Sequence, residues 1–357
     1  MESRMTVEFW TSGAGVPVAN ARQARRAEEA GFDGITYVDS QNLAGDCYIA
    51  LALAAHATTR LKLGTGVTNS GTRHPAVTAC AIATVQAESG GRAYLGIGRG
   101  DSALAHLGRA PDKVRVFEDY LERVQGYLSG EEVPFEAGGN VDSLELADQP
   151  TASKIEWLRT GQPKVPVDVA ATGPRVIAAA ARHADRVSFA LGADPERIRW
   201  GIDVAQAARQ DAGLDNKIDF AAYVPIVVHD DPDIARQIGE GGLSLFARFS
   251  VMHGEVIGPA TDEQRAVFER IHDSYDMNQH SRTGSPQAAE LTTSFAQEFG
   301  IFGPPSYCID RIAKLVELGI DRFFCVGPGP GSGSAEAVEA AERLSNEVMP
   351  TFRTSGN

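Results

Sequence analysis

An arginine among glycines, at the end of an apolar stretch, has the clearest potential for ligand chemistry in this sequence. The apolar residues 93–97 are followed by residues 98–101, which read Gly-Arg-Gly-Asp. Glycines let backbone N–H groups approach an anion closely, and the Arg99 guanidinium can grip a phosphate with two parallel hydrogen bonds. A dinucleotide-binding fingerprint would need glycine in place of Asp101, so that fold is disfavoured. The alternative is a tight strand-to-helix turn in which Arg99 pairs with Asp101.

A second glycine-containing segment, residues 64–70, precedes the start of a helix. Gly64 and Gly66 would weaken an ordinary buried strand, so they indicate a bulge or a backbone that must come close to a ligand. A histidine, His74, stands just before Pro75, the first residue of the expected helix. A histidine there is more often a structural cap than a catalyst.

A third segment is the apolar strand expected over residues 167–171, which is followed by Thr-Gly-Pro-Arg. The free N–H groups at a helix start attract anions, and the Thr172 hydroxyl and Arg175 can add to that attraction. We therefore expect Ala171, Thr172, Gly173 and Arg175 to form an anion-binding site. Capping of the helix by Thr172 is an equally good interpretation of the same residues.

Acidic and amide side chains follow another expected strand, residues 35–38. At the carboxyl end of a barrel strand such groups converge on a ligand, so Asp39 and Gln41 are candidates for acid–base chemistry. The glycine run at residues 327–333 follows the last expected strand. It is either a rival phosphate site or a flexible loop.

Repeated helix-to-strand junctions indicate the fold that must position these residues. Gly31, Gly213 and Gly319 each end an amphipathic helix and are followed by a hydrophobic residue, an aspartate and an apolar strand. The repetition predicts βα units and hence a parallel sheet. About eight strands are expected, over residues 6–10, 35–38, 61–67, 93–97, 167–171, 187–189, 220–228 and 323–326. That number closes a (β/α)₈ TIM barrel, and an open doubly wound sheet is the alternative.

We expect one domain over residues 1–357, with two excursions from the barrel. Residues 130–165 are rich in Pro and Gly, whereas residues 243–303 are polar and mostly helical. Excursions on the catalytic face of a barrel commonly shape the substrate pocket. The candidate substrate-facing residues are Tyr223, His253, Tyr275 and His280, and we favour His280 as a catalytic residue.

Composition limits the classes of partner. The 357 residues are 43% hydrophobic and 22% charged, as in globular proteins, and the formal net charge is -14. That charge argues against nucleic-acid and anionic-membrane partners, which require a positive surface, and favours small molecules. The four cysteines form no CxxC pair, so no metal site or disulfide framework is expected. Because no apolar run could span a membrane and residues 1–5 lack the character of a signal peptide, we expect a cytoplasmic protein.

Taken together, these segments resemble the luciferase-like family of flavin and deazaflavin oxidoreductases. The resemblance covers residues 6–130 and 165–215, with a weaker continuation near 300–327. It implies a non-prolyl cis peptide at Gly66-Val67 that supports the face of the cofactor ring. Thr68 and Asn69 would then offer polar groups to the ring or the substrate.

Two branches of the family differ in cofactor. Residues 65–69, 73–75 and 192–197 resemble the deazaflavin-dependent methylenetetrahydromethanopterin reductases, which transfer hydride. In contrast, residues 96–100 resemble luciferase, in which the arginine matching Arg99 grips the phosphate of FMN. The histidine that often follows the acidic residue in both branches is absent, because Ser40 follows Asp39. Deazaflavin binders also commonly have a lysine near Ala193.

These differences favour FMN. We therefore expect a two-component monooxygenase that receives FMNH₂ from a separate flavin reductase and oxygenates a small organic substrate in an enclosed pocket. The alternatives are a coenzyme F-420-dependent hydride-transfer enzyme using the same site and a non-catalytic flavin-binding protein. A homo-oligomer is also expected.

Overall fold

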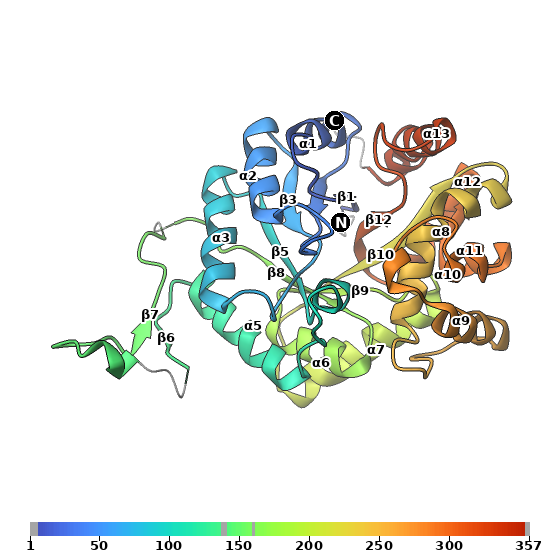
Figure 1. Ribbon diagram of the computed structural model, residues 1–357. Coiled ribbons are helices and arrows are strands. Elements are labelled where there is room, and N and C mark those ends of the chain that lie inside the picture. Colours follow the sequence, from blue (N-terminus) through green and yellow to red (C-terminus); the bar gives the residue numbers. More distant parts are fainter. Residues whose placement is uncertain (1–5, 137–140, 159–160, 354–357) are drawn as a thin grey trace.

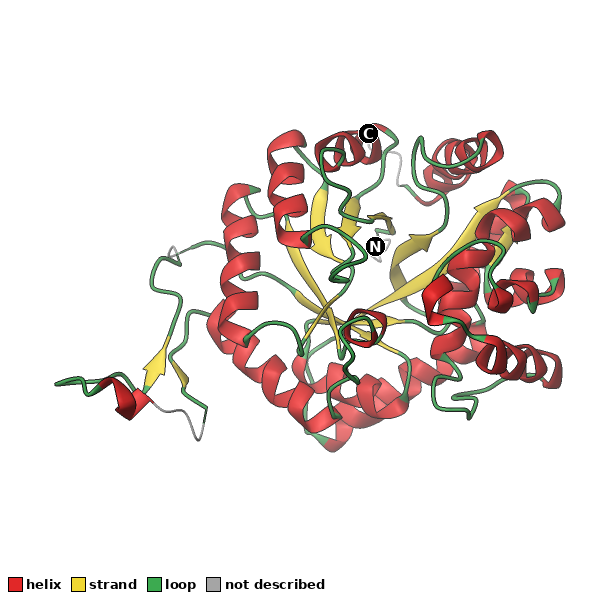
Figure 2. Cartoon of the chain, viewed as in Figure 1, coloured by secondary structure: helices red, strands yellow, loops and turns green. Residues whose placement is uncertain are grey.

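The computed structural model describes residues 6–136, 141–158 and 161–353, which form a closed barrel of eight parallel strands surrounded by helices (Figures 1 and 2). The barrel strands are β1 (Glu8–Gly13), β2 (Gly34–Tyr37), β3 (Lys62–Thr65), β5 (Ala93–Gly98), β8 (Val167–Ala171), β9 (Arg186–Phe189), β10 (Asp219–Val228) and β12 (Ile320–Val326). The ring closes because β10 pairs with β9 and β12, and β12 pairs with β1. The predicted TIM barrel is confirmed and the open sheet is wrong.

Helices connect successive strands and cover the outside of the barrel. They are α1 (Asn20–Glu29), α2 (Cys47–Ala57), α3 (Pro75–Glu88), α4 (Ser102–Ala105), α5 (Val114–Leu128), α6 (Pro174–His183), α7 (Pro195–Asp211), α8 (Pro232–Phe249), α9 (Asp262–Ser274), α10 (Pro286–Ala289), α11 (Thr293–Phe299), α12 (Pro305–Glu317) and α13 (Ala335–Arg343). The main core lies between these helices and the strands.

The glycines at the predicted junctions have the backbone conformation that the sequence requires. Gly31, Gly213 and Gly319 have φ angles of 84°, 67° and 101°, in the left-handed region that other residues rarely adopt. Each reverses the chain after a helix, so that the next strand can return to the barrel.

The third strand is shorter than predicted. β3 ends at Thr65, the Gly66-Val67 peptide is cis, and the chain then forms β4 (Thr68–Asn69), which pairs with β5. The cis bond is the one that the family resemblance implied. This short segment turns residues 66–69 toward the carboxyl end of the barrel.

The prediction that the insertions lie on the carboxyl face of the barrel holds only for residues 243–303, because the two excursions lie at different ends of the barrel. The described part of residues 130–165 contains an antiparallel pair, β6 (Val133–Pro134) with β7 (Ala152–Ser153), which projects from the barrel (Figures 1 and 2). Because this segment connects α5 to β8, it belongs to the amino ends of the strands; residues 137–140 and 159–160 lie outside the described residues. Residues 243–303 follow β10 and are mostly helical, as predicted, but end in β11 (Ile301–Gly303), an unpredicted strand that extends the pairing of β10.

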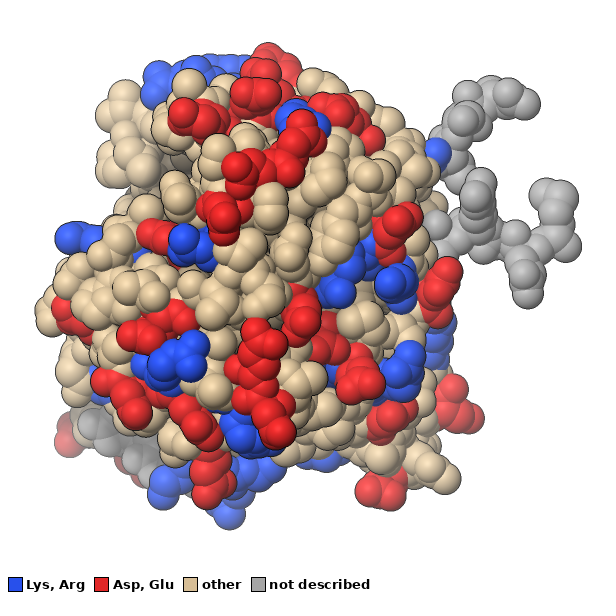
Figure 3. Space-filling view, turned by 90° about the vertical axis from the view of Figure 1, so that its right-hand side faces the viewer, with Lys and Arg blue, Asp and Glu red and all other residues tan. Residues whose placement is uncertain are grey.

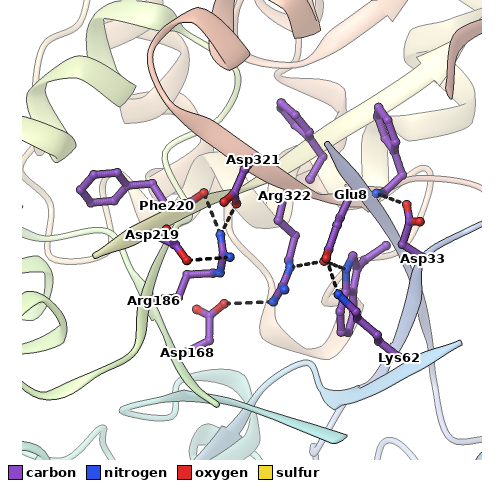
Figure 4. Close-up of polar contacts among 12 residues, drawn as sticks. Glu8, Asp33, Lys62, Asp168, Arg186, Asp219, Phe220, Asp321 and Arg322 are labelled. Atoms are coloured by element: carbon purple, nitrogen blue, oxygen red, sulfur yellow. Dashed lines mark hydrogen bonds and ion pairs between the residues drawn. The ribbon is translucent and has the colours of Figure 1, made fainter. Parts of the chain in front are cut away.

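A layer of buried charges crosses the inside of the barrel near the amino ends of the strands (Figure 4). Glu8 forms ion pairs with Arg322 and Lys62, and Arg186 pairs with Asp321 and Asp219. Burial alone would raise the pKa of Glu8, but the charges of Arg322 and Lys62 lower it to about 2. These contacts link side chains of β1, β9, β10 and β12 and of the first residue of β3.

Asp168 belongs to the same layer. It is only 1% exposed, and one of its carboxyl oxygens lies 4.0 Å from the Arg322 guanidinium. Burial raises the pKa of Asp168, although Arg186 and Arg322 oppose this effect. The layer therefore carries stability rather than ligand chemistry, since it lies at the end of the barrel away from the strand carboxyl ends.

The outer surface mixes both signs of charge. Figure 3 shows the right-hand face of Figure 1, where acidic and basic side chains of the described residues are interspersed rather than gathered into a basic surface. No helix within the described ranges is long and apolar enough to cross a bilayer. The four cysteines, all of them described, are unpaired.

Candidate active site

A cavity of about 660 Å³ opens at the carboxyl ends of the strands. Its walls come from residues of β1, β10 and β12, from the segments that follow β2, β3, β5, β8 and β9, from α8, and from residues 252, 253, 257, 280 and 281. This is the end of a TIM barrel at which ligands bind. Of the predicted site residues it is lined by Gly66, Val67, Thr68, Asn69, Arg99, Thr172, Gly173, Arg175 and His280.

Aromatic side chains form the floor and one wall of this cavity. Tyr223 stacks between Phe324 and Phe246, with ring centroids 4.5 Å and 5.6 Å apart, and Trp10 packs edge-on against Phe324 at 5.6 Å. Phe249 continues the wall from the end of α8. A flat apolar ring system can therefore be held here away from water.

Arg99 lies in this cavity, and no described residue forms an ion pair with it. Its Nε is buried and makes no hydrogen bond within the described residues. Burial lowers the pKa of Arg99, and the charge of Arg175 lowers it further. The sequence alternative, a pair between Arg99 and Asp101, is wrong, because Asp101 forms a two-point ion pair with Arg248 instead. Neither guanidinium forms an ion pair with another described residue, so the two neighbouring guanidiniums provide a binding site for a phosphate.

Helix α6 begins at the same cavity. Its N-cap is Gly173, which offers no side chain to the helix, so the predicted capping by Thr172 is wrong. The Thr172 hydroxyl donates to the Ala190 carbonyl oxygen at 3.3 Å. Ala171 is buried in β8 and does not line the cavity, whereas its neighbours Ala170 and Thr172 do. The uncapped helix start adds anion-attracting N–H groups beside the two arginines.

Glycine occurs in and beside the site for two different reasons. Gly64 and Gly66 are glycines because of their protein neighbours, since added Cβ atoms would lie 2.1 Å from the Tyr94 ring and 2.4 Å from Thr36 Oγ1. Approach to a ligand is therefore not what excludes a side chain at these two positions. An added Cβ on Gly98, in contrast, would meet nothing closer than Val67 Cγ2 at 3.4 Å.

Gly173 likewise has space, because the nearest atom to an added Cβ is Ile257 Cδ1 at 3.8 Å. Neither Gly98 nor Gly173 has a positive φ. Because both line the cavity, their missing side chains keep room for a ligand rather than for the protein.

The acid–base candidates on the second strand lie behind the cavity wall, so the expectation that they face a ligand is corrected. Asp39 is 2% exposed and forms an ion pair with Arg73, while it accepts hydrogen bonds from Thr68 Oγ1 at 2.6 Å and from Gln41 Nε2 at 2.7 Å. Neither Asp39 nor Gln41 lines the cavity. Asp39 instead fixes the hydroxyl of Thr68, and Thr68 does line the cavity.

The predicted histidine His280 reaches the cavity from the excursion after α9. Its Nδ1 lies 2.8 Å from Tyr275 Oη, and the Arg248 guanidinium lies over the Tyr275 ring at 4.7 Å from the centroid. Burial lowers the pKa of His280 to about 4, although Asp101 opposes this effect. The imidazole is therefore neutral at neutral pH, and only its Nε2 is left for a ligand.

The remaining predicted positions lie outside the cavity or at its rim. His74 caps α3, because its Nδ1 accepts from the Ala76 N–H at 3.1 Å, as the commoner interpretation held. Residues 327–333 do not line the cavity, so the rival phosphate site is not supported. A second cavity of about 740 Å³ is lined mainly by residues 213–220, at the end of the barrel associated with stability.

Several lining residues were missed by the sequence reasoning. They include Trp10, Thr36, Phe246, Phe249, Met252 and Phe324. The i, i+3 spacing of Phe246 and Phe249 is a detectable helical signal. It was missed because the excursion was taken to begin at residue 243, whereas α8 runs to Phe249 as the barrel's own helix and extends over the mouth.

Comparison with known proteins gives one family, and the similar relatives include methylenetetrahydromethanopterin reductases and mycobacterial phthiodiolone dimycocerosates ketoreductases. Residues 6–322 match the luciferase-like monooxygenase family. The chain is 28% identical over 338 residues to a 5,10-methylenetetrahydromethanopterin reductase of Methanolobus tindarius, covering 92% of this chain and 96% of that protein.

Solved structures share the fold. A coenzyme F-420-dependent tetrahydromethanopterin reductase of Methanopyrus kandleri superposes with a TM-score of 0.73 at 24% identity, covering 98% of this chain and all of the other. A monooxygenase of Streptomyces bottropensis gives a TM-score of 0.66 at 18% identity, with 97% and 100% of the two chains covered.

Proposed function

The chain belongs to the luciferase-like monooxygenase family, and on this premise we propose that it is an oxidoreductase that uses coenzyme F-420 to transfer hydride. The observation that carries the choice of cofactor is the end-to-end similarity to a methylenetetrahydromethanopterin reductase, together with the likeness to an F-420-dependent structure. This reverses the preference for FMNH₂ that Arg99 and Ser40 led us to expect. It makes the hydride-transfer alternative the leading function.

The residues present fit a phosphate-bearing cofactor of this type. Arg99 and Arg175 would hold the phosphate, with the uncapped start of α6 beside them. The backbone at Gly66-Val67 and the aromatic floor would flank the ring, because both line the same cavity. Gly98 and Gly173 leave the space that such a molecule needs. When bound, the cofactor would donate or accept the hydride.

The protein's own groups would orient the substrate and exclude water. The aromatic wall of α8 covers the barrel mouth, which removes solvent that would compete for polar contacts. His280 would offer Nε2 to a polar atom of the substrate, and Tyr275 would hold the ring through Nδ1. Asp39 would keep the Thr68 hydroxyl in place from behind the wall, as a positioning residue.

A second candidate is FMNH₂-dependent oxygenation, in which a flavin reductase would supply the reduced cofactor. Arg99 favours it, because residues 96–100 resemble luciferase, in which the matching arginine grips the phosphate of FMN, and the Nε of Arg99 has no partner within the described ranges. The likeness to a monooxygenase structure is compatible with it. A non-catalytic flavin-binding role has no comparable support, because the relative and structures compared are enzymes.

Oxygen uptake distinguishes the two candidates. The purified protein is mixed with reduced F-420 or with FMNH₂ at equal concentration, and oxygen consumption is followed with an electrode. We expect no acceleration above the protein-free rate with reduced F-420, and no uptake with FMNH₂ beyond that of free flavin. Protein-dependent oxygen consumption with FMNH₂ that leads to an oxygenated product would overturn the proposal in favour of the second candidate.

A further inference from the structure

One part of the cavity lining is apolar. Phe246, Phe249 and Met252 come from α8 and the residues after it, and Phe246 stacks on Tyr223 with ring centroids 5.6 Å apart. Phe246 and Phe249 pack edge to face at 5.4 Å with an interplanar angle of 80°. Their outward surfaces therefore form a corner of aromatic rings rather than a polar groove.

A bound cofactor phosphate would leave the cavity without an unmatched charge. Within the described residues its lining contains two permanent cations, Arg99 and Arg175, and one carboxylate, Asp101. Asp101 is neutralised by Arg248, which is held outside the lining by this ion pair and by its contact with Tyr275. Once a cofactor phosphate occupies Arg99 and Arg175, no fixed cation of the lining remains for an acidic substrate.

His280 does not supply the missing charge. It is neutral at neutral pH because of its burial, and its Nδ1 is occupied by Tyr275. His253, the other histidine of the lining, is exposed at the rim. Burying a carboxylate or phosphate against the aromatic corner would leave that charge without a partner, at a cost that strongly selects against acidic molecules.

We infer that the substrate is an uncharged molecule with a bulky apolar body, packed in the corner formed by Phe246, Phe249 and Met252, with one polar group near His280. This inference rests on the proposed function, because it assigns Arg99 and Arg175 to the cofactor phosphate. It separates this chain from enzymes that select anionic substrates. The selecting features are the aromatic corner and the absence of a spare cation among the described lining residues.

Isothermal titration calorimetry with a matched pair of probes tests the inference. The neutral ketone 2-acetonaphthalene and the anion 2-naphthoate share their ring system and differ in charge. Both are titrated into protein saturated with oxidised F-420 or, if F-420 does not bind, with FMN. We expect the ketone to bind at least tenfold more tightly than the carboxylate. Equal or tighter binding of 2-naphthoate would overturn the inference.

Variants locate the binding site. Phe249→Ala should weaken ketone binding at least fivefold, whereas the control Phe135→Ala, an exposed phenylalanine after β6, should leave it unchanged. Met252→Lys should raise the affinity for 2-naphthoate, because it supplies the missing cation. An unchanged ketone affinity in Phe249→Ala would show that the aromatic corner does not hold the substrate. Failure of F-420 to bind would contradict the proposed function alone, because the probe titrations proceed with FMN.

Discussion

Arg99 and Arg175 face the same cavity from the ends of neighbouring strands, and burial together with the repulsion from Arg175 lowers the pKa of Arg99. Their strands, β5 and β8, are adjacent in the barrel although 76 positions separate the two residues (175 − 99). The charges of Asp112 and Asp101 oppose this repulsion only in part, so an anion bound between the two arginines would be favourable. This relationship is the basis for placing a cofactor phosphate here.

Arg99→Ala should weaken cofactor binding by about 1–3 kcal/mol, the range for losing a charged hydrogen-bond partner. Because the Arg99 Nε has no partner among the described residues, the melting temperature should barely change. Arg115→Ala, at an exposed position of α5, is the matched control. Equilibrium titration and thermal unfolding check both expectations. Unchanged cofactor affinity would make Arg99 a structural arginine.

Gly66 and Gly98 should respond differently to alanine. Gly66→Ala should cost about 1–3 kcal/mol of stability, because its Cβ would lie 2.4 Å from Thr36 Oγ1. Thr36→Gly in the same chain should restore part of the loss, because it also removes the Cβ of residue 36, which would lie 2.6 Å from the added atom. Chemical denaturation provides the measurement, and an undiminished free energy of unfolding would refute the expected clash.

Gly98→Ala should leave the free energy of unfolding nearly unchanged and weaken cofactor binding. An added Cβ here meets no protein atom closer than 3.4 Å, but it enters the cavity that Gly98 lines. Denaturation and cofactor titration of the same variant separate the two effects. Full cofactor affinity in a stable Gly98→Ala protein would mean that this part of the cavity is not used.

Asp39→Ala should destabilise the fold by about 3–5 kcal/mol, since it leaves the Arg73 charge largely buried without its main partner. Gln41→Ala removes only one hydrogen bond to the same carboxylate and should cost about 0.5–1.5 kcal/mol. Urea unfolding of the two variants provides the comparison. If Asp39→Ala were as stable as wild type but inactive, Asp39 would be a catalytic acid or base after all.

Protonation of His280 should make the fold less stable in mild acid. Burial lowers its pKa from 6.5 to about 4, so the unfolded chain takes up the proton first. Its contribution is fully present above pH 6.5 and is lost as the pH falls through about 4. His280→Gln should flatten the dependence of unfolding free energy on pH between these values, whereas His253→Gln, at the exposed rim, should not. Identical pH profiles for wild type and His280→Gln would contradict this.

Local patterns predicted the barrel because they are repeated along the chain. Gly31, Gly213 and Gly319 each mark a helix end by a backbone conformation that glycine alone adopts readily, and this signal is readable without tertiary contacts. The β6–β7 pair and β11 were not predicted, because strands of two or three residues carry too little periodicity to detect.

The site was harder to predict than the fold, because the strands of a parallel barrel are buried on both faces. Thr36, Val38 and Ser40 line the cavity, so Asp39 necessarily points away from it, and the same alternation excludes Ala171. An apolar run does not reveal which of the two alternating sets of side chains along a strand faces the inside of the barrel. Nor could the sequence pair Asp101 with Arg248, since 147 positions separate them and only the fold brings α8 over the mouth.

Competition between the two cofactors tests the central claim most directly. The wild-type protein is titrated with oxidised coenzyme F-420 and with FMN in the same buffer, and each is then displaced by the other. We predict a dissociation constant for F-420 at least about tenfold lower than that for FMN, a difference of about 1.4 kcal/mol. A dissociation constant for FMN equal to or lower than that for F-420 would contradict the proposed hydride-transfer function.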